Sequence, residues 1–131
     1  MMTKTDHVAY WLATADDNWR ELHNMVRAGD YLPALFWAHL CIEKLSKALW
    51  VKENEANIPP RIHNIISLLR DTSCRLTPEQ TTLATQLNNF QLEGRYPDHH
   101  RRMQRIATAS FTTSLLAEIA VLRQCLLAML P

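Results

Sequence analysis

The sequence predicts an all-α fold, an antiparallel up-and-down bundle of four long helices and one short helix. Apolar residues recur at spacings of three and four along most of the chain, which is the period of an amphipathic helix. The chain holds only two glycines, fewer than most sheet-rich folds need for their turns. Helix start and stop signals separate the periodic segments. Because 131 residues are enough for one core, residues 1–131 are expected to form a single domain.

The first two helices are expected to form an antiparallel hairpin. The first runs from about Thr5 to Ala28, and Gly29 suits the left-handed position that follows a helix. Asp30 is a suitable N-cap for the second helix, which spans about Tyr31 to Glu53. So short a connection forces the two helices to run antiparallel. The apolar seam of the first helix consists of Val8, Leu12, Ala15, Trp19, Leu22 and Val26.

The second helix is apolar nearly all round from Leu35 to Ile42, which is typical of the most enclosed helix of a bundle. His39, Glu43 and Lys47 stand at positions i, i+4 and i+8, so they form one polar ridge on this helix. Two interpretations of the ridge are open. It is a solvated face with two weak ion pairs, each worth roughly 0.2–0.5 kcal/mol, or a polar strip that faces a ligand or a dimer partner.

Two further helices follow the Pro59-Pro60 pair, which ends the second helix. A short one is expected from about His63 to Asp71, where His63 is open to three roles: capping, packing or facing a site. The next one begins at a capping box formed by Thr77 and Gln80, with a proline between them at the first helical position. It is expected to run to about Leu92.

The net charge of +1 excludes a strongly basic nucleic-acid-binding protein, so any electrostatic attraction has to be local. Residues 95–105 hold the obvious local excess of basic side chains. The three cysteines are far apart and lack a metal-ligand spacing. Cys41 and Cys125 lie in apolar helical stretches and are expected to be buried thiols. A reduced, cytoplasmic compartment is therefore expected, with no metal or other cofactor and no membrane segment.

The segment Gly94–Arg102 interrupts the helical pattern before a last helix, expected from about Met103 nearly to the C-terminus. Pro97 cannot continue a helix, and Asp98 is expected to be the N-cap of the helix that follows. The next basic residues would then occupy the first two turns, where the dipole disfavours each cation by roughly 0.3–1 kcal/mol. They are His99, His100, Arg101, Arg102 and Arg105.

A bound phosphate would relieve that unfavourable charge, and arginine side chains that extend into water would reduce it as well, so both interpretations stay open. Arg95 and His100 also stand in Arg-x4-His spacing. Arginine binds phosphate in a bidentate manner, and histidine exchanges protons near neutral pH. These two groups suffice in principle for RNA cleavage without a metal, with the 2′-hydroxyl as nucleophile.

Three segments are similar to the motifs of one known family. Residues 36–49, FWAHLCIEKLSKAL, are similar to a helix signature around Glu-Lys-x-x-Lys-Ala. Residues 59–65, PPRIHNI, are similar to a Pro-x-x-His-(Asn/Asp)-Leu turn, and residues 94–98, GRYPD, match an Arg-Tyr-Pro-Asp motif before the last helix. The order of helices matches too, so the chain resembles the HEPN-domain family over nearly its whole length.

The resemblance implies a bundle that dimerises, with the Arg-Tyr-Pro-Asp regions near a shared cleft. It implies binding of nucleotides or RNA, and a minimal nucleotidyltransferase as partner in a toxin–antitoxin-type module. A ribonuclease subset of the family carries a catalytic Arg-x4–6-His pair, which maps onto Arg95 and His100. That subset has a polar residue directly after the arginine, whereas this chain has Tyr96-Pro97.

Whether the protein is an enzyme stays open between two hypotheses, beside a purely structural interaction domain. In the first, a homodimer binds a nucleotide or RNA together with a nucleotidyltransferase partner. Arg95 and Arg101 hold phosphate, Asp98 fixes the loop, Tyr96 stacks or packs, and the ridge of His39, Glu43 and Lys47 lines the cleft. In the second, the protein is a metal-independent ribonuclease toxin that uses Arg95 and His100.

Overall fold

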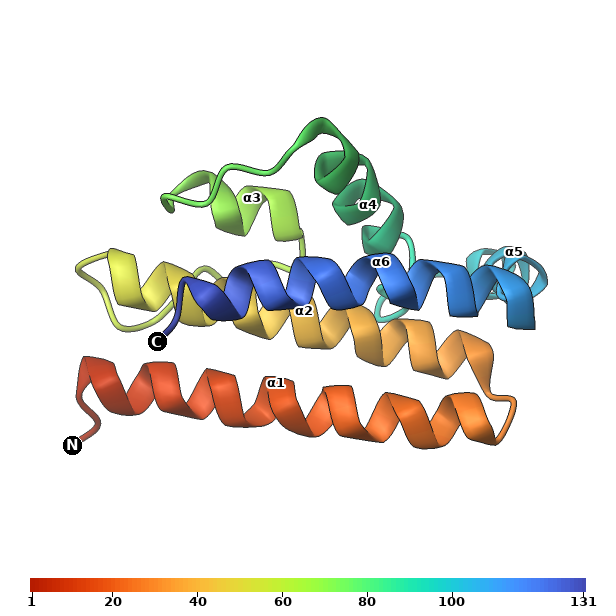
Figure 1. The fold of residues 1–131 in the computed structure, drawn as a ribbon, viewed down its shortest axis with the longest axis horizontal. Helices are drawn as coiled ribbons and strands as arrows, with labels where there is room; N and C mark the ends of the chain where they lie inside the picture. The colour runs from red at the N-terminus through yellow and green to blue at the C-terminus, as the bar shows by residue number, and fades with distance from the viewer.

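The computed structural model describes residues 1–131, and it is an all-helical bundle, as the sequence predicts (Figure 1). Six helices replace the five expected, because the C-terminal helical region is divided in two. The helices are α1 (Lys4–Arg27), α2 (Tyr31–Glu53), α3 (Ile65–Arg70), α4 (Pro78–Asn88), α5 (Pro97–Ile106) and α6 (Ala109–Ala128).

The hairpin of α1 and α2 is confirmed, and its ends follow from local chemistry. Thr3 and Asp6 form a capping box: the Thr3 hydroxyl accepts the Asp6 amide at 3.1 Å and the Asp6 carboxylate accepts the Thr3 amide at 2.9 Å. Gly29 has a φ of +80°, the left-handed conformation that lets the chain turn back at once. Asp30 is the N-cap of α2, although its side chain makes no capping hydrogen bond.

The helix α2 is the centre of the bundle, as its apolar sequence indicates. It packs against α1, α3, α4, α5 and α6, whereas most other helices touch only one or two neighbours. Fourteen of its residues are buried, including charged and titratable ones discussed below. Any polar group on α2 is therefore enclosed unless a neighbouring element leaves a gap beside it.

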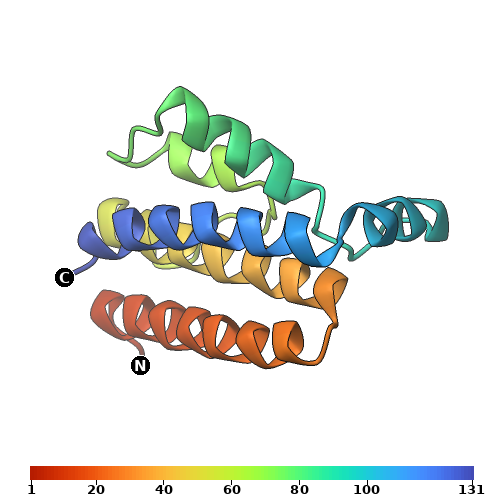
Figure 2. The ribbon, with the colours of Figure 1, turned by 45° about the vertical axis from the view of Figure 1, so that its right-hand side comes forward.

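The direction of the last helix differs from an alternating up-and-down bundle. In Figures 1 and 2, α6 runs parallel to α2, from the end where α5 lies to the end that carries the C-terminus. The segment from α3 to α5 is the crossover that makes this possible. Leu115, Ile119, Leu122 and Leu126 form the buried seam of α6. By length and mean hydropathy alone α6 could also span a membrane, but it carries Glu118 and Arg123.

The expected single helix from Met103 onward is wrong, because the chain breaks after α5. Ala107 leaves the helical conformation with a ψ of 61°, and Thr108 begins α6 as its N-cap. The Thr108 hydroxyl accepts the Phe111 amide at 3.3 Å. A threonine in a helical pattern is thus the start of a new helix, and α5 becomes a separate element.

Of the two helices before α5, α4 begins at its predicted signal, whereas α3 begins two residues later than expected. In α4, the Thr77 hydroxyl and the Gln80 amide side chain complete the capping box, with Pro78 in the first turn. The helix ends at Asn88, four residues before the predicted end, which leaves residues 89–96 as a loop. In α3, the N-cap is Asn64, whose side chain accepts the Ser67 amide, so His63 lies outside the helix.

The cysteines divide into one enclosed thiol and two that are more accessible. Cys41 is fully buried in α2, and burial raises its pKa to about 12. Cys125 is exposed, which corrects the expectation that it is buried. The reason is its place on α6, one residue before Leu126 and therefore about 100° away from the buried seam.

Candidate functional site

The polar ridge of α2 is a buried charge network. His39 is 0%, Glu43 4% and Lys47 8% exposed. The Lys47 ammonium donates to Glu43 Oε2 at 2.9 Å, and His39 Nδ1 lies 3.7 Å from Glu43 Oε1. The solvated-face interpretation is therefore wrong. Because these charges are buried, water cannot solvate them, and each depends on its partner for stabilisation.

Two segments from outside α2 cover this network. The indole of Trp11 on α1 stacks against the ammonium of Lys47, which lies 5.3 Å from the ring centroid. On the other side, the loop before α3 lies across the ridge, with Pro59 buried and His63 hydrogen-bonded to Glu43. Both covers come from parts of the chain that the periodicity of α2 does not reveal.

His63 connects the buried network to the surface. Its Nδ1 donates to Glu43 Oε1 at 3.0 Å, since a carboxylate can only accept. Its side chain is 50% exposed, and Nε2 makes no hydrogen bond within the chain. A buried carboxylate that fixes one ring nitrogen leaves the other one oriented and available. This is how enzymes and binding sites commonly aim an imidazole, and it gives His63 a role that the sequence left open.

His39, a neutral imidazole, forms a hydrogen bond to the same loop from its buried side. Its Nε2 lies 3.1 Å from the carbonyl oxygen of His63 and 3.3 Å from Asn88 Oδ1, so this nitrogen carries the proton. Burial lowers the pKa of His39 below its usual value, and the attraction of Glu43 opposes this shift only in part. The Nε2–H group of the buried His39 ring therefore connects the His63 loop to α2 and to Asn88 of α4.

Acidification is expected to weaken this arrangement. Below pH ~6.5 the unfolded chain binds a proton at residue 39 that the buried ring resists, so the free energy of unfolding falls as pH drops from ~7.5 to ~5.5. The His39→Gln variant keeps a donor near the position of Nε2 and cannot titrate, so its urea midpoint should change less over this range. His23→Gln, at an exposed position, is the control. Equal pH dependence in wild type and His39→Gln would contradict the assignment.

A polar pocket opens beside His63. It has a volume of about 260 Å³, and its wall contains no apolar residue. Arg95 lies in the same wall as His63, exposed and outside every ion pair of the structure. The structure thus brings together the Arg95 loop and, through His63, the α2 ridge. The wall consists of His63, Asn64, Asn88, Gln91, Glu93 and Arg95.

The loop that carries Arg95 leads into α5, and the N-cap of α5 is not the residue that the sequence predicts. Gly94 turns the chain with a φ of +73°. Tyr96 is the N-cap of α5, without a side-chain capping bond, and Pro97 is the first helical residue. The expected capping role of Asp98 is therefore wrong: a proline suited to the first position shifts the cap to the residue before it. Asp98 lies exposed within the first turn, where its charge favours the helix dipole.

The arginines of α5 also lie farther along the helix than expected. Because α5 begins at Pro97 and has ten residues, Arg101 and Arg102 are in its middle and Arg105 is in its last turn. The predicted dipole penalty therefore does not apply to them. Figure 2 shows α5 projecting at one end of the molecule. On its exposed side, Asp98 and the three arginines surround a second polar hollow of about 300 Å³.

The two histidines of α5 hold the loop in place. His99 is buried and its Nε2 donates to the carbonyl of Asn89 at 2.7 Å, while His100 Nε2 donates to the carbonyl of Leu92 at 2.9 Å. His100 does not line the pocket of Arg95. Tyr96 is outside that wall as well, with 84% of its surface exposed. Of the residues predicted for the site, Arg95 alone lies in the wall of the polar pocket, and the ridge reaches it through His63.

The whole bundle, with this pocket in it, matches a known family. The family model of the HEPN domain matches residues 8–122, which include most of α1, all of α2 to α5 and most of α6. The chain belongs to the HEPN-domain family. A solved structure from Thermus thermophilus, described as that of TT1696, has 26% sequence identity to the chain and a TM-score of 0.73. That match covers 93% of this chain and 94% of the other. No curated protein matches the sequence.

Within this HEPN domain, several pocket residues escaped sequence reasoning. Asn88 and Gln91 lie at the end of α4 and in the loop after it, where the sequence predicted continued helix. Asn64 is a helix cap and also lines the pocket. His63 and Asn64 gave a signal as part of the segment 59–65, but that signal did not indicate which wall they would join.

Proposed function

We propose that this HEPN protein binds the phosphate groups of RNA or of a nucleotide in the polar pocket beside His63. One observation carries the proposal: an unpaired Arg95 and a carboxylate-oriented His63 share a wall without apolar residues. A guanidinium offers a planar pair of donors to phosphate, and the imidazolium form of His63 adds a third from Nε2 while Nδ1 donates to Glu43. The amides of Asn64, Asn88 and Gln91 supply neutral donors around them.

The basic side of α5 supports RNA rather than a single nucleotide. Arg101, Arg102 and Arg105 make no ion pair in the structure and lie on the helix that directly follows Arg95. Phosphate contacts spread along one segment suit a ligand that carries several phosphates. Asp98 beside Arg101 keeps the cluster from being uniformly positive. Tyr96 is exposed just before α5 and offers a ring on which a base can stack.

A homodimer and a minimal nucleotidyltransferase partner in a toxin–antitoxin-type module belong to the same proposal. Family membership and the similarity of residues 94–98 to the Arg-Tyr-Pro-Asp motif support them. In a dimer that pairs these regions, two copies of Arg95 face one cleft. Such an arrangement doubles the positive charge available to one RNA strand.

The Arg95→Ala variant tests the binding site. A charge-assisted hydrogen bond to phosphate is worth ~1.5–3 kcal/mol, so affinity for a short fluorescein-labelled single-stranded RNA should fall about tenfold or more. Each lost phosphate contact should also reduce the slope of log K against log salt by about 0.7. Fluorescence anisotropy across a salt series measures both quantities.

Arg70→Ala is the matched control, because Arg70 is an exposed arginine in the last turn of α3 and outside the polar pocket. It should leave affinity and salt slope unchanged, while Arg101→Ala should weaken binding as Arg95→Ala does. If affinity falls equally in the Arg70 and Arg95 variants, the loss comes from the change in net charge alone, and the proposed binding site is wrong. Absence of any salt-sensitive RNA binding by the wild-type protein would overturn the function.

A metal-independent ribonuclease is the second candidate, and the geometry of His63 favours it. In such cleavage a base takes the proton of the 2′-hydroxyl, whose oxygen attacks the phosphorus as the 5′-oxygen leaves, and an arginine stabilises the charge that develops. Arg95 fits the second role. His63 shares its pocket, whereas the Nε2 atom of His100 is engaged at the Leu92 carbonyl. If the labelled RNA is cut in EDTA, comparison of His63→Ala with His100→Ala identifies the base.

A further inference from the structure

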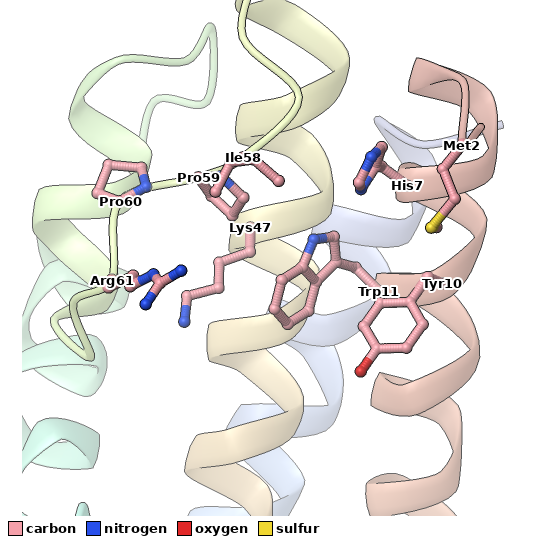
Figure 3. A pocket seen from close by; sticks show the side chains of 9 residues that line it. All are labelled: Met2, His7, Tyr10, Trp11, Lys47, Ile58, Pro59, Pro60 and Arg61. Atoms are coloured by element: carbon pink, nitrogen blue, oxygen red, sulfur yellow. The ribbon is translucent and has the colours of Figure 1, made fainter.

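A second pocket lies between α1 and α2, beside the loop that leads to His63 (Figure 3). Its volume is about 350 Å³, within the range of ~300–1,000 Å³ usual for small-molecule sites. Its walls come from Met2, from the N-terminal part of α1, from Lys47 of α2 and from residues 58–61. None of these residues lines the polar pocket, so this is a separate site.

Two cations line this pocket without an acidic side chain among them. Lys47 is more than nine-tenths buried, and Figure 3 shows its ammonium and the guanidinium of Arg61 pointing to the same side of the pocket. Arg61 makes no ion pair. Glu43 compensates the charge of Lys47 but not that of Arg61, and its other oxygen accepts from His63. A pair of like charges converging on one hollow is relieved by an anion that accepts from both.

The rest of the wall is mainly flat and apolar, with His7 as its one other polar side chain. Trp11 presents its indole beside Lys47, with Tyr10 edge-on to it at a centroid distance of 5.3 Å. Pro59 and Pro60 line the side formed by the loop. Of the eight large apolar side chains that are exposed in the whole protein, three line this pocket: Met2, Tyr10 and Ile58. Such clustering of exposed apolar groups is typical of a binding surface.

We infer that this pocket binds a small planar anion, an aromatic ring that bears a carboxylate or a phosphate ester. The ring lies against Trp11 and the apolar side chains around it, and the anionic group reaches Lys47 and Arg61. Stacking on an indole and a charge-assisted bond to a guanidinium require one ligand that is flat at one end and anionic at the other. This inference goes beyond RNA binding and does not depend on it.

The test uses the full chain and the probes 1-naphthoate, 1-naphthyl phosphate and the uncharged 1-naphthalenemethanol. The indole N–H signal of Trp11, assigned with Trp11→Phe, is followed by 1H–15N NMR during each titration, and calorimetry gives the affinity. At least one anion should shift this signal and bind about tenfold more tightly than the alcohol. The tighter of the two anions identifies the anionic group.

Arg61→Ala should weaken binding of that anion about tenfold. Because Arg61 is exposed and unpaired, the variant should fold normally, and Arg27→Ala is the matched control on α1. Arg95→Ala should bind the anion as the wild type does, which separates this result from the fate of the RNA proposal. The inference is overturned if neither anion shifts the Trp11 signal, if the alcohol binds equally well, or if Arg61→Ala binds the anion as tightly as wild type.

Discussion

Replacing Glu43 by alanine is expected to lower the free energy of unfolding by about 3–5 kcal/mol. Glu43 is only 4% exposed, and its two oxygens accept from Lys47 and from His63. Without it, a buried ammonium lacks any counter-charge in the protein. Since a domain of this kind is stable by about 5–15 kcal/mol, such a loss is a large part of the total. Urea denaturation followed by circular dichroism measures it.

The double variant Glu43→Leu/Lys47→Met separates loss of charge compensation from loss of packing. It removes both charges and keeps most of the volume, so it should be much closer to wild type than Glu43→Ala. A double variant as unstable as the single one would show that the ion pair is not what Glu43 contributes. RNA binding by the double variant is informative too: His63 then lacks its carboxylate, and affinity should fall even though the fold persists.

The Phe90→Ala variant should cost about 3–5 kcal/mol as well, for a different reason. Phe90 is 1% exposed, in the loop after α4, and its ring lies 6.1 Å from that of Phe111 on α6. It is the apolar anchor of the loop whose next residues line the polar pocket. Removing the ring leaves a cavity beside Gln91 and frees the loop from α6.

The matched variant Phe90→Leu retains most of the apolar contact and should lose clearly less stability than Phe90→Ala. Urea midpoints with unchanged slope would show a pure stability effect. RNA affinity measured where Phe90→Ala is still folded should also decline, because the wall formed by Gln91, Glu93 and Arg95 loses its anchor. A Phe90→Ala protein as stable as wild type would contradict the anchoring role.

Local sequence signals predicted several parts of the fold well. The Gly29 turn, the capping box at Thr77 and the enclosed character of α2 depend on neighbours within four residues, and all three are confirmed. The division after Ile106 is not predicted by the sequence, because apolar residues continue the helical period across it. Only the hydroxyl of Thr108 marks the new helix, and a threonine is compatible with either interpretation.

The candidate site was less predictable because it is assembled over long distances. Spacing placed Glu43 and Lys47 on one face, but it did not show that Trp11 and the His63 loop cover them. The two halves of the polar pocket, His63 and Arg95, are far apart in the sequence and meet only when α4 and its loop fold against α2. The parallel orientation of α2 and α6 likewise depends on the crossover segment between them, and local periodicity does not predict it.

The bonds from α5 to the preceding loop do not depend on whether its two histidines are charged. His99 and His100 each donate from Nε2 to a carbonyl, and an imidazole donates from that nitrogen whether it is neutral or positively charged. Protonation therefore adds charge near the loop without releasing it. Acid therefore acts on the shape of the pocket from the opposite wall, where the buried ring of His39 holds the His63 loop.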